Sequence, residues 1–146
     1  MSARQMQIQF RQFHPDDTEA TVALWQACGL TRPWNDPHKD IERKLQQEPE
    51  LFIVAEHNGQ LLGSVMAGYD GHRGWIYYLS VLPQYQSQGL GKSLVLQAEQ
   101  RLRSKGCPKI QLMIRHDNSG VQDFYRTLGY ESAEVVVLGK RLIEDV

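Results

Sequence analysis

The feature that most limits how this chain can fold is the junction at residues 86–93, QSQGLGKS, which separates an apolar run from a long amphipathic segment. The run at 75–82 is rich in aromatic and β-branched residues, as strands are. From Leu90 onward, apolar residues recur at helical spacing up to Gly106, and Pro108 prevents the helix from continuing. The pattern predicts a strand that passes through a glycine-containing loop directly into a helix.

The remaining segments predict a succession of further strands and helices. Asp16 and Glu19 have the spacing of a capping box, Asp36 and Asn118 are suitable caps for two later helices, and Asn58-Gly59 is a strong hairpin signal. The order β, α, α, β, β, β, α, β, α, β predicts one mixed sheet with helices on its faces, in a single α+β domain over residues 1–146. Strands are expected at 7–13, 51–56, 60–69, 75–82, 110–114 and 135–138, and helices at 16–29, 37–47, 90–103 and 118–129.

The composition argues against several other classes of protein. The chain has 146 residues, 41% of them hydrophobic and 23% charged, which suits one compact globular domain. A net charge of −1 gives no basic field for a nucleic-acid partner. No apolar run approaches the ~20 residues of a membrane span, and MSARQMQIQF lacks the apolar core of a secretory signal. We therefore expect a cytoplasmic protein with neither a nucleic-acid nor a membrane partner.

Cysteine and histidine give no sign of metal or disulfide chemistry. Cys28 and Cys107 do not form a CxxC pair, and without an export signal reduced thiols are expected. The five histidines show no pair at helical ligand spacing, so no metal site is expected.

The glycine loop has two rival nucleotide-binding interpretations, and both lose a required residue. A GxxxxGK[ST] phosphate loop ending at Ser93 needs glycine where the chain has Gln86, and a GxGxxG fingerprint needs glycine in place of Leu94. What remains is Gln86-x-x-Gly89-x-Gly91 at the start of a helix. The first N–H groups of a helix lack partners and carry the positive end of its dipole, so the loop is either a diphosphate site or a flexible turn.

Two separated motifs carry a family resemblance. YLSVLP at 78–83 with QSQGLGKSL at 86–94 matches the Q/R-x-x-G-x-G/A coenzyme motif, and Asn118 with FYRTLGY at 124–130 matches an N…FYxxxGF/Y segment. In both, and in its order of elements, the chain resembles the GNAT superfamily of acyl-CoA-dependent N-acetyltransferases, and more narrowly its small bacterial YpeA-like type. The resemblance implies a largely antiparallel central sheet and acetyl-CoA as co-substrate.

The resemblance also implies roles for individual residues. Leu79 and Val81 would hydrogen-bond the pantetheine arm, and the Val81 N–H would polarise the thioester carbonyl. Tyr125 stands at the position of the family's general acid, and Asn118 would contact the coenzyme arm. The diphosphate would be bound by the loop residues Gln86, Gln88, Gly89, Leu90, Gly91, Lys92 and Ser93. Many relatives have arginines where this chain has Gln86 and Gln88, which puts the strength of coenzyme binding in doubt.

The remaining chemistry leaves alternatives open. An amine acceptor must lose a proton, and His72 in the turn at 70–74 is the first candidate base, although a solvated turn histidine is equally compatible with the sequence. Asp70 would attract a cationic amine or merely shape the turn, and a water chain would also serve as base. Tyr125 is spaced to be a core aromatic as well. The resemblance would place one wall of the acceptor site in the loop 31–37, at Arg32, Trp34 and Asp36, although Trp34 is equally a packing residue and Arg32 a surface ion-pair partner.

The function that these observations favour is that of an acetyltransferase. It would transfer the acetyl group of acetyl-CoA to a primary amine, on a small molecule or a protein, by direct attack in a ternary complex. Neither cysteine has an identifiable basic partner, so no acyl-enzyme is expected. The alternative is a module that binds coenzyme A or acyl-CoA without catalysis. A strand at 135–138 with an exposed edge would allow a homodimer.

Overall fold

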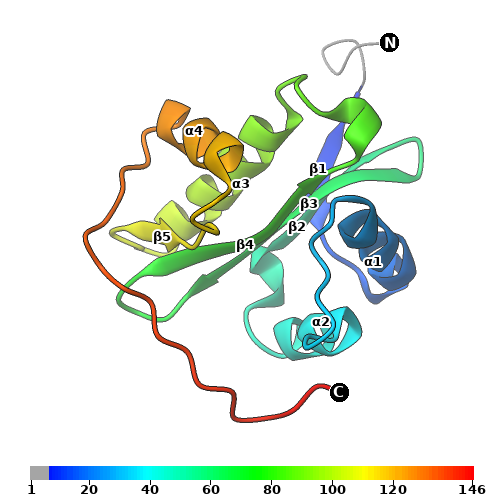
Figure 1. The fold of residues 1–146 in the computed structure, drawn as a ribbon. Helices are drawn as coiled ribbons and strands as arrows, with labels where there is room; N and C mark the ends of the chain where they lie inside the picture. The colour runs from blue at the N-terminus through cyan, green and yellow to red at the C-terminus, as the bar shows by residue number, and fades with distance from the viewer. Residues whose placement is uncertain (1–6) are drawn as a thin grey trace.

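The computed structural model describes residues 7–146, which form one five-stranded mixed sheet with helices on both faces (Figure 1). The strands lie in the order β1-β2-β3-β4-β5, and every neighbouring pair is antiparallel except β4 and β5, which are parallel. The helix α3 connects these two parallel strands. The strands are β1 (Gln9–Gln12), β2 (Phe52–His57), β3 (Gln60–Tyr69), β4 (Gly74–Val81) and β5 (Ile110–Leu112); the helices are α1 (Thr18–Ala27), α2 (Pro37–Leu45), α3 (Leu90–Ser104) and α4 (Ser119–Thr127), with 3-10 turns η2 (Pro15–Asp17), η3 (Pro49–Leu51) and η4 (Pro83–Tyr85).

Two hydrophobic cores form, one on each face of the sheet. α3 supplies the first core with Leu94, Val95 and Leu102, which are fully buried against β2, β3 and β4. α1 and α2 cover the other face, where Trp25 and Ile41 pack with residues of β2 and β3. Because side chains alternate along a strand, β2 supplies apolar residues to both cores and is buried on both faces.

Local sequence signals set several element boundaries as expected. Asn58 and Gly59 both have positive φ, 49° and 79°, and join β2 to β3 in a tight hairpin. The Asp36 carboxylate accepts the His38 N–H at 2.9 Å and so begins α2, with Pro37 at its first position. At the start of α4, the Asn118 side chain accepts the Val121 N–H at 3.2 Å.

β4 contains an irregularity that the sequence does not announce. Ser64 of β3 faces Ser80 and Met66 faces Tyr77, so two residues of β4, Tyr78 and Leu79, stand opposite the single residue between them. Tyr78 accordingly has φ of 52°. This is a β-bulge, a device that bends a strand and redirects its side chains.

Two local predictions are wrong. Residues 135–138 do not form a strand: their side chains are 60–89% exposed, and the segment runs without a partner. Their strand propensity is not realised because a strand is stabilised by packing and pairing with neighbouring strands. The homodimer predicted to form through this strand therefore loses its structural basis. The capping box is also misplaced. The observed box begins two residues earlier, at His14. Its Nδ1 accepts the Asp16 N–H, and the Asp17 carboxylate accepts the His14 N–H at 2.8 Å.

No helix in the described part of the chain is both long and apolar enough to cross a membrane.

Candidate active site

The backbone edge of β4 is open over part of its length. β5 pairs with β4 only from Gly74 to Ile76, so residues 77–81 are paired with β3 alone. The Leu82 N–H donates to Leu62 O at 2.8 Å, and antiparallel strands alternate hydrogen-bonded and non-hydrogen-bonded pairs. The Val81–Gly63 pair is therefore of the second kind, which directs the Val81 N–H to the open edge. The Val81 carbonyl accepts Gln86 Nε2 at 2.9 Å and Cys28 Sγ at 3.2 Å. Such an edge suits an extended ligand that adds to a sheet.

The glycine loop lies at the end of this open edge, at the N-terminus of α3. Gly89 is the N-cap residue with φ of 87°, and no side chain caps the helix. The first helical bond joins the Ser93 N–H to Gly89 O at 3.1 Å, so the N–H groups of Leu90, Gly91 and Lys92 have no acceptor within the helix. The first turn also contains no acidic residue. These donors and the helix dipole together suit an anion such as a diphosphate.

The two glycines of the loop are needed for different reasons. A Cβ built on Gly89 meets no protein atom within 4 Å, so the space beside it is open for a ligand, and its positive φ disfavours other residues. A Cβ on Gly91 would lie 3.4 Å from Cζ of Phe124, which packs over the loop from α4. Gly91 therefore permits close packing between helices, whereas Gly89 leaves room at the surface.

Two side chains of the loop are engaged within the protein. Gln86 donates from Nε2 to Val81 O at 2.9 Å, and Ser93 Oγ donates to Gly89 O at 3.1 Å. Both bonds brace the loop against its own strand and helix. Lys92 is exposed and carries a positive charge, while Gln88 is half-buried.

Tyr125 is buried in the core that also contains Val81 and Leu90. Its ring makes edge contacts with Phe124 and Tyr130, with centroids 5.0 and 5.4 Å apart. Burial raises the pKa of Tyr125 well above its usual range, so the phenol keeps its proton at neutral pH. The structure thus brings together the open edge, the glycine loop and a protonated phenol. Asn118 is exposed at the start of α4, where its side chain serves as a helix cap.

His72 does not lie beside the glycine loop and Tyr125. It is exposed in the turn before β4, whose eight residues at a rise of ~3.3 Å each place its two ends about 23 Å apart. The Asp70 carboxylate accepts the N–H groups of His72 and Arg73 at 2.8 and 2.7 Å, which is the turn-shaping alternative foreseen for it. These bonds lower the pKa of Asp70.

A polar cluster on the other face of the sheet is absent from the sequence-based predictions. The Tyr78 hydroxyl donates to Asp40 Oδ2 at 2.6 Å, and Asn35 Nδ2 donates to both Asp40 and the Tyr78 hydroxyl. The Tyr78 ring stacks on Trp25 with centroids 3.7 Å apart. Burial, followed by the Asp40 carboxylate, raises the pKa of Tyr78 far above its usual value. Because the β-bulge turns Tyr78 toward α2, only the folded chain reveals this cluster.

Among residues 7–146 there is no group of three or more histidine, cysteine or acidic side chains placed to hold a metal ion.

Comparisons with known proteins identify the family of this chain. Residues 11–130 match the family model described as the acetyltransferase (GNAT) family. An acetyltransferase of Pectobacterium atrosepticum is 53% identical over 138 residues, covering 94% of this chain and 98% of the relative. An acetyltransferase of Sodalis glossinidius is 52% identical over 139 residues with the same coverage. The chain therefore belongs to the GNAT family of acetyltransferases.

Solved structures show the same fold. The aminoglycoside N-acetyltransferase AAC(6')-Iy, in complex with CoA, superposes with a TM-score of 0.77 at 21% identity and covers 98% of this chain and 100% of its own. The ribosomal-protein-S18-alanine N-acetyltransferase of Escherichia coli has a TM-score of 0.74 at 21% identity, covering 87% of this chain and 79% of its own. At these identities the likeness defines the fold, which is the acyl-CoA N-acyltransferase fold expected from the sequence.

Proposed function

We propose that this protein transfers the acetyl group of acetyl-CoA to a primary amine by direct attack in a ternary complex. The observation that carries the proposal is the continuity of two binding features. The open edge of β4 at residues 77–81 is followed by the 3-10 turn η4 and then by the uncapped N-terminus of α3, and Gln86 of the loop bonds Val81 O at 2.9 Å. A linear ligand with an amide-containing arm and a diphosphate matches this pair of features.

The chain's own groups have separate tasks in this proposal. The N–H groups of Leu90, Gly91 and Lys92 bind the diphosphate, with Gln88 and Gly89 lining the same loop. The backbone of Leu79 and Val81 pairs with the pantetheine arm, and Asn118 contacts it from the start of α4. The Val81 N–H donates to the thioester carbonyl oxygen and so stabilises the charge that develops there during attack.

Tyr125 is the proposed proton donor to the departing thiolate. Its raised pKa suits this task, since a phenol that stays protonated at neutral pH acts as an acid and not as a base. Tyr125 and Val81 share one hydrophobic core, which supports this role.

The group that removes the amine's proton is less narrowly defined. His72 remains the side chain proposed from the sequence, although its turn lies at the far end of β4 from Val81. A chain of water molecules that ends at a backbone carbonyl is the alternative. The pH dependence of turnover in the His72→Ala variant separates the two.

The acceptor class is a primary amine, on a small molecule or a protein. Solved neighbours of the same fold are named for both kinds, an aminoglycoside in one case and an alanine of ribosomal protein S18 in another. These neighbours make both kinds of acceptor worth testing.

The first experiment compares thermal stabilisation by acetyl-CoA, free coenzyme A, ATP and NAD, followed by an amine screen that detects free thiol. A ligand at a hundred times its Kd adds ~2.7 kcal/mol to the free energy of unfolding. Stabilisation by the two coenzyme A species alone, with turnover on an amine, supports the proposal. Stabilisation by ATP, or by no compound, refutes the coenzyme site, and coenzyme binding without turnover on any amine favours a non-catalytic binding module.

A further inference from the structure

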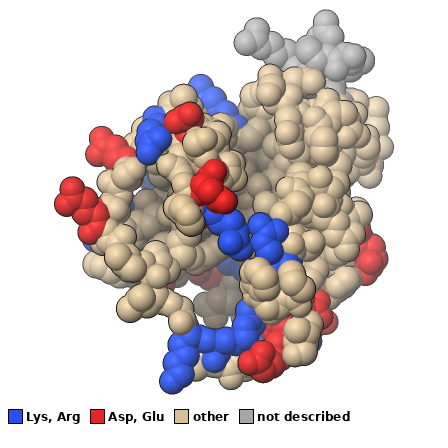
Figure 2. Space-filling view, in the orientation of Figure 1, with Lys and Arg blue, Asp and Glu red and all other residues tan. Residues whose placement is uncertain are grey.

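The C-terminal segment, residues 131–146, passes outside the body of the protein from α4 to α2 (Figure 1). It contains neither helix nor strand, and its large apolar side chains are exposed. The space-filling view is hollowed between this segment and the body of the molecule, with basic side chains on the lower rim of the hollow (Figure 2). The segment therefore spans an opening and does not pack along the surface beneath it.

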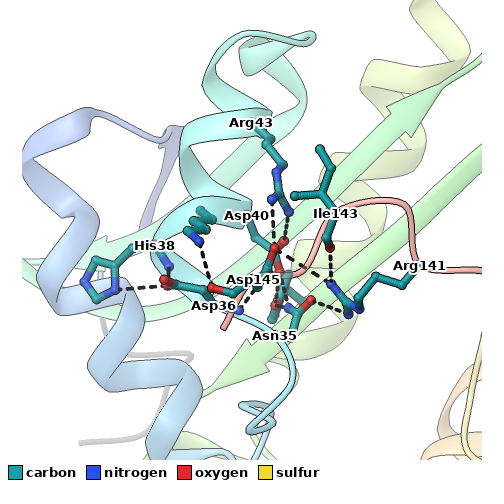
Figure 3. Close-up of polar contacts among 10 residues, drawn as sticks. Asn35, Asp36, His38, Asp40, Arg43, Arg141, Ile143 and Asp145 are labelled. Carbon is teal, nitrogen blue, oxygen red and sulfur yellow. Dashed lines mark hydrogen bonds and ion pairs between the residues drawn. The ribbon is translucent and has the colours of Figure 1, made fainter.

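Asp145 is the buried exception in this segment, with a side chain that is 0% exposed (Figure 3). Its Oδ2 accepts the Asp36 N–H at 2.9 Å and its Oδ1 accepts Arg43 at 2.8 Å. Its backbone carbonyl accepts Lys39 Nζ at 2.7 Å, and Arg141 approaches the carboxylate at 3.8 Å. One residue thus ties together the loop before α2, the helix α2 and the C-terminal segment.

The elements held by Asp145 are the ones that reach the bulge of β4. Asn35 adjoins Asp36 in the loop, and Asp40 lies one turn before Arg43 on α2; both hydrogen-bond the Tyr78 hydroxyl. Tyr78 in turn lies within the open edge of β4 at residues 77–81. The Asp145–Arg43 bond, the Arg43–Asp40 ion pair at 3.6 Å and the Tyr78–Asp40 bond therefore connect the C-terminal segment to the strand on which the thioester is proposed to lie.

We propose that Asp145 is a positioning residue for the amine acceptor. It fixes the C-terminal segment as one wall of the acceptor site and holds the loop at 31–36 and α2 as the opposite wall. The proposal rests on the proposed function, because it assigns the α1–α2 face of β4 to the acceptor. The buried carboxylate of Asp145 accepts hydrogen bonds from groups on separate segments of the chain. Removing this carboxylate would therefore release all of those segments together.

The kinetic test compares Asp145→Ala with Glu144→Ala, which removes the same charge from an exposed neighbour. The substrates are acetyl-CoA and the best amine among an aminoglycoside, a peptide with N-terminal alanine and free lysine. We expect Asp145→Ala to raise KM for the amine about tenfold, equivalent to ~1.4 kcal/mol, while KM for acetyl-CoA stays within about twofold. Glu144→Ala should leave both unchanged. An unchanged amine KM, or an equal loss for both substrates, would overturn the proposal.

A second measurement needs no acceptor and keeps the proposal testable if none of the amines reacts. Hydrogen exchange is followed in Asp145→Asn, which keeps the side-chain shape, and in the wild-type protein. We expect faster exchange in peptides covering 31–40 and 74–81 as well as in the C-terminal segment. Faster exchange confined to residues 141–146 would show that Asp145 holds only its own segment and would refute the inference. Failure of the proposed function has a different signature, namely that the wild-type protein is not stabilised by acetyl-CoA.

Discussion

Replacing Gly89 by valine tests whether the loop at the start of α3 binds the coenzyme diphosphate. The residue has φ of 87°, so any side chain there is strained, yet a Cβ meets no protein atom within 4 Å. Gly106 provides a matched control at the other end of the same helix, with φ of 83° and equally open surroundings. Each substitution should cost ~1–2 kcal/mol of unfolding free energy through left-handed backbone strain.

The two variants should differ in their response to acetyl-CoA. For a chain of this length a loss of 1 kcal/mol lowers Tm by about 3 °C, so both variants should melt about 3 to 6 °C below the wild type. At a ligand concentration a hundred times the wild-type Kd, a tenfold weaker site reduces the stabilisation from ~2.7 to ~1.4 kcal/mol. We expect this reduction, or a larger one, in Gly89→Val and none in Gly106→Val.

The assay is a thermal-shift titration with acetyl-CoA, checked by calorimetry at 25 °C. A full coenzyme response in Gly89→Val would refute the placement of the diphosphate. An equal loss in Gly106→Val would show that strain in α3, and not the position of the side chain, weakens binding.

Three other predictions concern catalysis and pH. Tyr125→Phe keeps the ring and removes the proton, so kcat should fall by ~10²-fold or more with acetyl-CoA binding unchanged; unaltered turnover would leave Tyr125 a purely structural residue. If His72 is the base, His72→Ala should lower the rate near neutral pH and abolish an inflection in its pH profile, whereas an intact profile would remove that assignment. Arg43, the Asp36 N–H and Arg141 lower the pKa of Asp145 below its ordinary value, so its ionised form contributes stability at neutral pH that is lost as the pH falls through the lowered pKa. Denaturation at pH 7 and pH 3 should show a stability gap between wild type and Asp145→Asn that narrows in acid, and a gap independent of pH would contradict this.

Much of the fold could be predicted because its signals are local. The Asn58-Gly59 turn, the Asp36 and Asn118 caps and the glycine stops depend on neighbours a few residues away. The loop at the start of α3 was recognisable for the same reason. Its placement beside an open strand edge also followed from the resemblance, which supplied the long-range information.

The features that escaped prediction depend on contacts between distant residues. The bulge at Tyr78 arises from register against β3, and no residue in the run 75–82 marks it. The bonds from Asp40 to Tyr78 and from Asp145 to Arg43 span 38 and 102 residues. Residues 135–138 mislead for the converse reason, because three consecutive valines favour a strand only where a partner strand exists.

The short pairing of β5 with β4 also fixes the length of the open edge of β4. β5 closes the edge of β4 at Ile76, and the glycine loop begins just past Val81, so the open stretch of residues 77–81 measures about 15 Å at ~3.3 Å per residue. The Val81 N–H, proposed to bind the thioester carbonyl, lies at the loop end of this stretch, and the closed pair of Ile76 and Leu112 lies at the other end. An acyl chain that followed the edge from Val81 would meet that closed end, so the length of β5 would set an upper limit on the size of the group that is transferred.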